Sequence, residues 1–447
     1  MIKLLKYTFV VTVALLTHWH STSAQVITTI AGGGSGTGEG VAATSVTINN
    51  PSQSIIDKSG NLYVPQLLGQ KVSRINSDGT IVTIAGTGVS GNSGDGGPAT
   101  AARLYMPNTV AIDDSGNVVI CDNNNSIVRK IDALTGNIRT IAGNGIAGYS
   151  GDNGPATNAS LMYPAGICYD KNGNLLISDG SRRVRKVAKS GIITTIAGVG
   201  LPGVSGDGGP ATTAKCGGGV ICTDKIGNIY VADNATGESR IAKIDTNGLI
   251  STYAGTSSGY IFNGDDIPAT SANINPIGMS FDKFGNLIFA DFYNNRIRMV
   301  DKFGIVRTIA GTGLAGFSGD GGLATLAQLN RPQGIAVDTC GNIYVSDNSN
   351  ARIRKITFSK CGYLRTDELK IVDKLSVFPN PTFSTVKLSG SFPISSFVIV
   401  DVLGKEVMKK NILAKPLTEM EIDVSTLLPG VYIVRVNDVW TARLVKE

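Results

Sequence analysis

Residues 308–356 read TIAGTGLAGFSGDGGLATLAQLNRPQGIAVDTCGNIYVSDNSNARIRKI and hold the pattern that decides the fold. Three short apolar runs of strand length, GIAVD, NIYVSD and RIRKI, follow one another. The TIAG run that opens the next copy supplies a fourth. Gly341-Asn342 suits a tight hairpin turn, because glycine accepts a positive φ and asparagine can bond to nearby backbone. The pattern predicts a small antiparallel sheet of four strands.

This unit is repeated around the chain. The Gly-Asn turn recurs every 54 to 58 residues, at Gly60, Gly116, Gly173, Gly227, Gly285 and Gly341. The TIAG-type run also occurs six times, but its first copy precedes the first turn and no copy follows the last turn. A closed ring resolves this offset if residues 26–31 form the outermost strand of the sixth unit, beside residues 352–358. We therefore predict an all-β fold, a six-bladed β-propeller closed by its N-terminal strand.

The repeats carry a family resemblance. GIAVD, GNIYVSD and RIRKI at residues 334–356, with more degenerate copies before them, resemble the NHL repeat, and the likeness covers residues 25–360. It implies a six-bladed propeller and no particular chemistry, because that fold serves binding modules, lyases and lactonase-like hydrolases. The chain departs from the shorter family repeat by a long connection, SGDGGPAT and its variants, between the fourth strand of one blade and the first strand of the next.

The two ends of the chain differ from the repeats. Residues 1–24 are predicted to be a signal peptide, with Lys3 and Lys6 before an apolar run and small residues up to Ala24. That run is shorter than the ~20 residues that span a bilayer, and we expect no transmembrane segment in the mature chain. Removing both lysines lowers the formal charge from +6 to +4. The basic residues of the third strands are spread around the ring, so nucleic-acid binding is not expected.

After a polar linker at residues 361–373, residues 374–447 show alternating apolar residues and turns that predict a small β-sandwich. The motifs FPNPT, VLGKEV and LPGVY resemble the C-terminal sorting domain of the type IX secretion system. The residues that carry this resemblance are Phe378, Pro379, Asn380, Pro381, Gly404, Gly430 and Tyr432. It implies that the secretion machinery is a partner and that the protein is secreted or attached to the outer-membrane surface. An ordinary adhesive sandwich is the alternative.

The cysteines and histidines limit the chemistry. Cys340 and Cys361 are expected on the same side of the sixth blade and could form a disulfide, or remain thiols. The two histidines, His18 and His20, lie in the predicted leader. The mature chain then lacks the usual general base and the commonest zinc ligand, which disfavours zinc lyases and Ser-His-Asp hydrolases. A calcium-assisted carboxylate mechanism stays open. The repeated GxGxxG runs are followed by SGD rather than a helix and are interpreted as turns.

Carboxylates and aromatic side chains gather on one side of the predicted ring, the loop face, which carries the long connections and the turns after the second strands. One ring of carboxylates lies in the connections, at Asp95, Asp152, Asp207, Asp265 and Asp320. A second ring follows the second strands, at Asp122, Asp179, Asp233, Asp291 and Asp347. Each could fix its own loop by accepting backbone N–H bonds, or the rings could bind calcium. The aromatic candidates, which could also pack within their loops, are Tyr149, Tyr260, Phe262, Phe292, Tyr293 and Phe317.

These observations favour a secreted or surface-attached propeller that binds a protein or glycan through its loop face and performs no chemistry. We expect no resident cofactor, with calcium as the one candidate. The alternative is an extracellular lyase or hydrolase acting on polysaccharide or lactone, with carboxylates and possibly calcium at the propeller channel. An enzyme requires carboxylates that converge on the axial channel, whereas a binding module requires an apolar or aromatic patch towards the rim.

Overall fold

The computed structural model describes residues 25–235, 238–256, 259–358, 376–378, 382–394, 396–401, 405–411, 417–436 and 440–446. The chain divides into two compact units, residues 1–361 and 362–447. The predicted leader, the predicted linker and Cys361 lie outside the described residues, so the Cys340–Cys361 disulfide stays a prediction. In the described part of the chain, no helix is both long and apolar enough to cross a bilayer.

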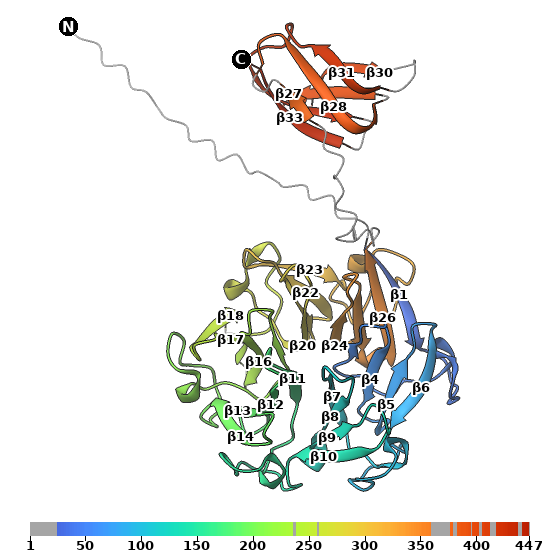
Figure 1. Ribbon diagram of the computed structural model, residues 1–447, viewed down its shortest axis with the longest axis vertical. Coiled ribbons are helices and arrows are strands. Elements are labelled where there is room, and N and C mark those ends of the chain that lie inside the picture. Colours follow the sequence, from blue (N-terminus) through green and yellow to red (C-terminus); the bar gives the residue numbers. More distant parts are fainter. Residues whose placement is uncertain are drawn as a thin grey trace, which may run out of the picture. The chain divides into compact units, whose positions relative to one another are not determined.

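The first unit is a ring of six antiparallel sheets, with the first strand of each sheet next to the axis (Figure 1). In the first three blades the strands, from the axis outward, are β3 (Ile55–Ile56), β4 (Leu62–Gln66), β5 (Lys71–Ile75) and β6 (Thr80–Ala85); β7 (Pro107–Ile112), β8 (Val118–Asp122), β9 (Ile127–Ile131) and β10 (Ile138–Ala142); β11 (Gly166–Tyr169), β12 (Leu175–Asp179), β13 (Arg183–Val187) and β14 (Ile193–Ala197). The all-β, six-bladed fold that the repeats predicted is confirmed.

The remaining blades have the same order. Their strands are β15 (Ile221–Thr223), β16 (Ile229–Ala235), β17 (Glu238–Ile244) and β18 (Ile250–Ala254) in the fourth; β20 (Pro276–Phe281), β21 (Leu287–Asp291), β22 (Arg296–Val300) and β23 (Ile305–Ala310) in the fifth; β24 (Pro332–Val337), β25 (Ile343–Asp347), β26 (Arg352–Phe358) and β1 (Gln25–Gly32) in the sixth. The outer strand of the sixth blade therefore comes from the start of the described chain. It pairs with β26 in antiparallel register, with Ile27 opposite Ile356 and Thr29 opposite Arg354.

The long connections cover the outer edges of the blades. Gly96 donates its N–H to the carbonyl of Ile138 in β10, and Ile138 donates back to Gly97. Gly321 and Gly322 make the same two bonds with Ile27 of β1. Two connections lengthen this pairing into short fifth strands, β2 (Val41–Ala42) and β19 (Ile267–Pro268). Unpaired edge strands promote aggregation, so each connection protects the next blade.

A 3₁₀ turn in each connection then fills the gap between neighbouring blades. The six turns are η1 (Ala43–Ser45), η2 (Ala99–Ala101), η4 (Ala156–Asn158), η5 (Ala211–Thr213), η6 (Ala269–Ser271) and η7 (Ala324–Leu326). In the second connection, Ala99, Ala102 and Leu104 are buried in one cluster with Ile120 and Ile138. Two further turns, η3 (Asn123–Asn125) and η8 (Asn348–Asn350), follow second strands. Because each cluster joins two blades, no blade completes its core alone.

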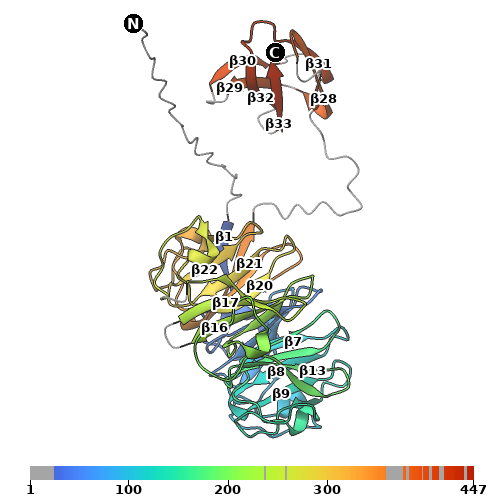
Figure 2. The same cartoon turned by 90° about the vertical axis from the view of Figure 1, so that its left-hand side faces the viewer.

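The second unit is a two-sheet β-sandwich. One sheet has the order β27 (Ser376–Phe378), β28 (Thr385–Ile394) and β31 (Leu417–Asp423), and the other has β30 (Glu406–Asn411), β29 (Ser396–Asp401), β32 (Gly430–Val436) and β33 (Trp440–Lys446). Figure 2 shows strands of both sheets. Leu388, Ile399, Val434 and Leu444 are fully buried between the sheets. The predicted motif residues Pro379, Asn380, Pro381 and Gly404 lie outside the described residues.

Ile27 tests whether β1 completes the ring. Its side chain is fully buried against Ile335 and Ile356, and Ile138 holds the equivalent, fully buried position in β10. We expect Ile27→Ala to cost about 2–5 kcal/mol of unfolding free energy because it opens a cavity in the core. Ile138→Ala is the matched control, and urea unfolding followed by circular dichroism measures both. A loss much smaller than that of the control would contradict ring closure by β1.

Candidate functional site

A fully buried arginine lies in the third strand of every blade after the first. Arg129 is representative: its guanidinium donates to the Asp95 carboxylate through Nε and Nη2, to the Arg103 carbonyl through Nη1 and to the Ser93 carbonyl through Nη2. Arg185, Arg298 and Arg354 hold the equivalent positions, whereas Arg240 lies two residues earlier in its strand. All five are among the largest buried side chains. A buried guanidinium is costly unless its donors are paired. The chain supplies acceptors to each of the five groups, although Arg185 Nη1, Arg240 Nε and Arg298 Nε lack one.

The outer ring of predicted carboxylates pairs with these arginines. Asp95, Asp152, Asp207, Asp265 and Asp320 lie 2.5–3.0 Å from the guanidinium nitrogens. The other oxygen of Asp95 accepts the backbone N–H of Thr140 on β10 at 2.8 Å. Although burial opposes it, hydrogen bonds from Thr140 and Arg129 lower the pKa of Asp95. In the second to fifth blades the outer carboxylate thus ties a connection to the edge strand that it covers, through Thr140, Thr195, Thr252 and Thr308.

The inner ring of predicted carboxylates is buried. Asp122, Asp179, Asp291 and Asp347 have no solvent exposure, and Asp233 has 1 %. In four blades an oxygen of this carboxylate lies 3.6–3.8 Å from the buried guanidinium. Burial raises the pKa of Asp122, Asp291 and Asp347 to about 6. These groups cannot touch a ligand on the surface, so their part in any ligand-binding face is indirect.

Three of the aromatic candidates pack on arginine. Arg183 lies over the Tyr149 ring at 3.7 Å, and Arg296 and Arg352 lie at 4.0 Å over the Phe262 and Phe317 rings. These stacked arginines precede the buried arginines by two residues. At that position the second blade has Ile127, and the fourth has Arg240, which is the buried arginine of its own blade. The matching connection positions hold Asn92 and Val204. An aromatic ring therefore occurs only where a second arginine can stack on it, as the cation–π interaction requires.

The first blade carries a neutral version of the same arrangement. Ser73 stands at the arginine position and Gln66 at the inner aspartate position, and Gln66 Nε2 donates to Ser73 Oγ at 2.8 Å. Gln66 Oε1 accepts the N–H of Asn49, as Asp122 accepts that of Tyr105. Glu39 still binds Thr83, through both carboxylate oxygens. The buried cation and the buried anion are thus absent together, while the hydrogen bonds to the backbone remain.

The inner acceptors hold an unusual corner at the start of four innermost strands. Asn50, Met106, Tyr163 and Arg331 each precede a proline and have φ values of +48° to +53°. Non-glycine residues seldom adopt this left-handed conformation, and it costs on the order of 1 kcal/mol or more. The residue before each corner donates its N–H to the buried side chain, as Tyr105 does to Asp122 at 2.7 Å and Asn330 does to Asp347 at 2.8 Å. The buried pairs therefore stabilise strained backbone on the loop face.

These corners present large side chains around the channel mouth. Tyr105, Met162 and Tyr163 are 38–45 % exposed, and Tyr293 on the fifth blade is 53 % exposed. Tyr293 also packs on Tyr260 and Phe292, with ring centroids 5.3 and 5.0 Å away. A cavity of about 450 Å³ beside Tyr293 is lined by Asn295, Ala315, Asn330, Arg331 and Ser349. The loop face thus combines aromatic, aliphatic and cationic groups.

The axial channel carries a different set of side chains. Its cavity, about 140 Å³, is lined by the innermost strands with residues such as Ile55, Thr109, Cys168, Cys222 and Met279, and no acidic residue lines it. The Gln53 amide of the first blade binds the sixth blade, donating to the carbonyl of Ile335 and accepting its N–H. Within the described ranges, no three His, Cys, Asp or Glu side chains are grouped to hold a metal ion. These residues do not fit a carboxylate or calcium centre at the channel.

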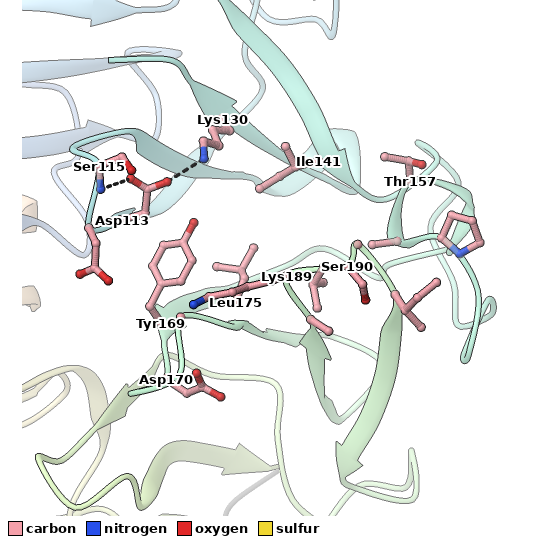
Figure 3. A pocket seen from close by; sticks show the side chains of 18 of the residues that line it. Asp113, Ser115, Lys130, Ile141, Thr157, Tyr169, Asp170, Leu175, Lys189 and Ser190 are labelled. Carbon is pink, nitrogen blue, oxygen red and sulfur yellow. Dashed lines mark hydrogen bonds and ion pairs between the residues drawn. The ribbon is translucent and has the colours of Figure 1, made fainter. Parts of the chain in front are cut away.

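A longer groove lies between the second and third blades on the turn face, the side with the turns after the first and third strands (Figure 3). Its volume is about 700 Å³. Lys130 Nζ lies 2.6 Å from Asp113 Oδ2, and the Tyr169 hydroxyl points towards this pair. Burial, with the nearby Asp113 and Asp114 charges, raises the pKa of Tyr169 to about 12. None of these groups was among the predicted site residues.

The buried arginines were likewise missed. RIRKI and its variants place an arginine at one position of the third strand in four copies, at Arg129, Arg185, Arg298 and Arg354, and Arg240 lies two residues earlier in the fourth blade. This regularity was the available signal. A charged residue that recurs once per blade on a strand buried on both faces needs a counter-charge that recurs with it. The aspartates of the connections recur at the same period. The neighbouring lysines, which are spread around the ring in the same way, concealed this signal.

Arg129 and Asp122 can be exchanged for the pair found in the first blade. Arg129→Ser alone leaves Asp122 buried without its cation, and we expect a loss of about 3–5 kcal/mol of unfolding free energy. Arg129→Ser with Asp122→Gln reproduces Ser73 and Gln66, and we expect this double variant to be more stable than Arg129→Ser. Urea unfolding monitored by circular dichroism gives both values. A double variant less stable than Arg129→Ser would refute the coupling.

The raised pKa of the inner aspartates predicts a pH dependence of stability. An unfolded Asp titrates near 3.9, so the folded state binds more protons between pH 4 and 6, and stability is gained as pH falls from about 7 to about 5. The pKa values of Asp95 and Asp152 are lowered in the folded state, so the stability that these carboxylates contribute is lost only below pH 4. Asp347→Asn should reduce the rise in melting temperature between pH 7 and 5. Asp78→Asn, on the surface, should leave it unchanged; equal slopes in all three proteins would contradict the assignment.

Models of known families match three parts of the chain. Residues 376–446 match the secretion system C-terminal sorting domain, residues 104–131 and 329–356 match the NHL repeat, and residues 147–202 match the teneurin NHL domain. The predicted recognition of NHL repeats and of the sorting domain is confirmed. The sorting domain marks the protein for type IX export, to the cell surface or the medium, with the secretion machinery as a partner.

Curated relatives and solved structures agree with the propeller. The chain is 28% identical over 286 residues to Protein SUPPRESSOR OF QUENCHING 1, chloroplastic, of Arabidopsis thaliana, covering 61% of this chain and 27% of that protein. It is 29% identical over 272 residues to chicken (Gallus gallus) Teneurin-1, covering 53% and 10%. A solved auxiliary nutrient binding protein from Bacteroides thetaiotaomicron has a TM-score of 0.54 at 16% identity, covering 75% and 77%. The chain thus spans about a quarter or less of these two curated relatives, and the solved structure shows the fold alone.

Proposed function

We propose that this exported propeller is a binding module that holds a protein partner on the inner rim of its loop face. The observation that carries the proposal is the set of strained corners at Asn50, Met106, Tyr163 and Arg331. Each corner uses a buried acceptor to hold a left-handed backbone next to proline, yet its own side chain differs from blade to blade. Strained backbone that the fold enforces is concentrated at functional sites. The varied side chains give such a site its specificity.

The residue types favour a protein over a glycan at this face. Tyr, Met and Arg are enriched in protein–protein interfaces, whereas Lys, Glu and Asp are depleted. The inner rim presents Tyr105, Met162, Tyr163, Tyr293 and Arg331. The outer connections with their SGDGGPAT segments wrap the rim and supply the rigid frame, with their carboxylates already paired to arginine. In this proposal the predicted aspartates, Tyr149 and Phe317 act as supports of the binding surface.

The alternative, an extracellular lyase or hydrolase, needs reactive groups that converge. The channel lining has hydroxyl, amide, thiol and aliphatic groups, and the two carboxylate rings face arginine rather than one another. The auxiliary nutrient binding protein shares the fold, and nutrient binding is compatible with a binding module. We therefore propose a non-catalytic role that needs no cofactor.

Glycine substitutions at the corners test the proposal without disturbing the backbone, because glycine accepts positive φ. Full-length protein, and a Met106→Gly, Tyr163→Gly, Arg331→Gly variant, would be immobilised and exposed to surface and secreted proteins of the producing cells. We expect the triple variant to lose at least about tenfold in affinity for the retained partner, as removal of interface anchors does. Surface plasmon resonance with the purified partner measures the change.

The matched control carries Phe284→Ala and Phe303→Ala on the turn face, where both rings are exposed at 69 % and 77 %. This variant should bind the partner as the unaltered protein does. Retention of the partner by the triple variant would place the site elsewhere. A partner released by glycosidase treatment would show that the ligand is a glycan and would refute protein binding.

A further inference from the structure

The turn that joins the first and second strands is built in the same way in the first five blades. In the fifth blade, Asp282 begins the turn, its Oδ1 accepts the N–H of Phe284 at 2.8 Å, and Gly285 follows with a φ of +86°. In the second blade, Ser115 donates its N–H to Asp113 in the same way, at 3.0 Å. Because this bond uses only the backbone of the residue at the tip, the turn leaves that side chain free to vary.

The residue at the tip of this turn is polar in the first three blades and apolar in the next two. The six tip residues, in blade order, are Ser59, Ser115, Asn172, Ile226, Phe284 and Cys340. The outer turn of the fifth blade also has a phenyl ring at its tip, Phe303, where the fourth blade has Asn247. Ile226, Phe284 and Phe303, which we call the apolar tips, are 67 %, 69 % and 77 % exposed. The turns form equally well with polar residues, so the fold does not require the apolar tips.

The apolar tips lie on neighbouring turns of the turn face, and a lysine precedes each of them. These lysines are Lys225, Lys283 and Lys302. Lys225 Nζ donates to the carbonyl of Lys283 at 2.9 Å and so links the turn of the fourth blade to that of the fifth. Lys302 donates its N–H to Asn286 Oδ1 at 3.2 Å, which links the two turns of the fifth blade. Single exposed apolar side chains are common on proteins, whereas a group of them marks an interaction surface.

The formal charges of these turns balance, because each turn has one lysine and one carboxylate at its base. The carboxylates are Asp224, Asp282 and Asp301. All three are half-buried and accept N–H groups of their own turns. The ammonium groups of Lys283 and Lys302 lie 4.9 and 5.1 Å from the ring centres of the phenylalanines that follow them. Attraction to this surface must therefore come from the apolar tips rather than from net charge.

We propose that the apolar tips insert into the interface of a lipid bilayer, with the fourth and fifth blades in contact with the membrane. Side chains at the tips of turns project from the protein, which suits a soft interface better than a rigid protein partner. Apolar side chains are buried in such an interface, while neighbouring lysines keep their ammonium groups among the phosphates. Type IX export to the cell surface brings the protein next to a membrane. This site lies on the turn face and is independent of the proposed protein surface.

Co-sedimentation of the exported protein with phosphatidylcholine vesicles tests the proposal. Neutral lipid is the probe because a chain with an excess of basic residues is attracted to any anionic vesicle. We expect the protein to bind, and Phe284→Ala with Phe303→Ala to lower the partition constant at least about tenfold, because binding scales with buried apolar area. Absence of binding, or equal binding by this variant, would overturn the proposal.

The matched control carries Ile146→Ala and Leu314→Ala on the loop face, where both side chains are exposed to a similar degree, 65 % and 66 %. This control should bind the vesicles as the unaltered protein does. Sedimentation equilibrium without lipid tests for another occupant of the surface. A dimer that the Phe284→Ala, Phe303→Ala variant does not form would show that a second copy of the chain covers the apolar tips, and would refute membrane binding.

Phe303→Trp measures insertion directly. We expect vesicles of phosphatidylcholine brominated in its acyl chains to quench the fluorescence that this variant adds, because the new ring lies among those chains. Leu134→Trp is the control, since Leu134 is exposed on an outer turn of the second blade, across the ring from the fifth, and its added fluorescence should not be quenched. Equal quenching in both variants, or none in Phe303→Trp, would contradict insertion of the apolar tips.

Discussion

The loop-face half of five blades depends on one interaction, a guanidinium that is removed from water and paired with the carboxylate of a connection. In four of these blades a second, inner carboxylate lies 3.6–3.8 Å away. Leaving a buried ion without its partner costs several kcal/mol, whereas the paired group contributes little net stability over an apolar core. The value of the arrangement is therefore geometric. Arg354 holds the connection through Asp320 and faces the inner corner at Asp347. A single side chain thus links the protected outer edge of a blade to the backbone at the channel mouth.

The chain contains its own test of this view, because its six copies differ. Where the arginine is replaced by Ser73, the inner aspartate is replaced by Gln66, and the backbone bond from Asn49 is kept. Where a second arginine is present, an aromatic ring is present to stack on it. Residues that contact one another in the scaffold therefore change together from blade to blade. A ring of aspartates that served a shared ligand would have no reason to disappear together with a buried arginine.

The architecture could be predicted from the sequence because it depends on local signals. A Gly-Asn turn fixes its hairpin without help from distant residues, and the offset between the turns and the TIAG runs indicated a ring closed by residues 26–31. The sorting domain was likewise recognisable from motifs such as LPGVY. The arginine pairs were harder, because they join residues about 33 positions apart, as Asp152 and Arg185 are, and each partner alone looks like an ordinary surface charge. The left-handed corners and the groove could not be predicted, for a different reason. A non-glycine residue before proline is expected to be extended, so Tyr163 and Arg331 contradict the local rule and are held only by contacts formed in the folded ring.

Symmetry gives a way to separate the scaffold from the sites. In a ring of equal units, a change at a buried position must be compensated by its neighbours, and the Gln66–Ser73 pair shows such compensation. Among the corner side chains, Tyr163 and Arg331 are exposed, so folding constrains them least, whereas Asn50 and Met106 are half-buried. Val119 belongs to neither group. It is fully buried, yet no larger neighbouring side chain offsets its small size, and space is left beside polar groups. A core that loses volume loses stability, so this interface lacks the kind of compensation that the Gln66–Ser73 pair provides.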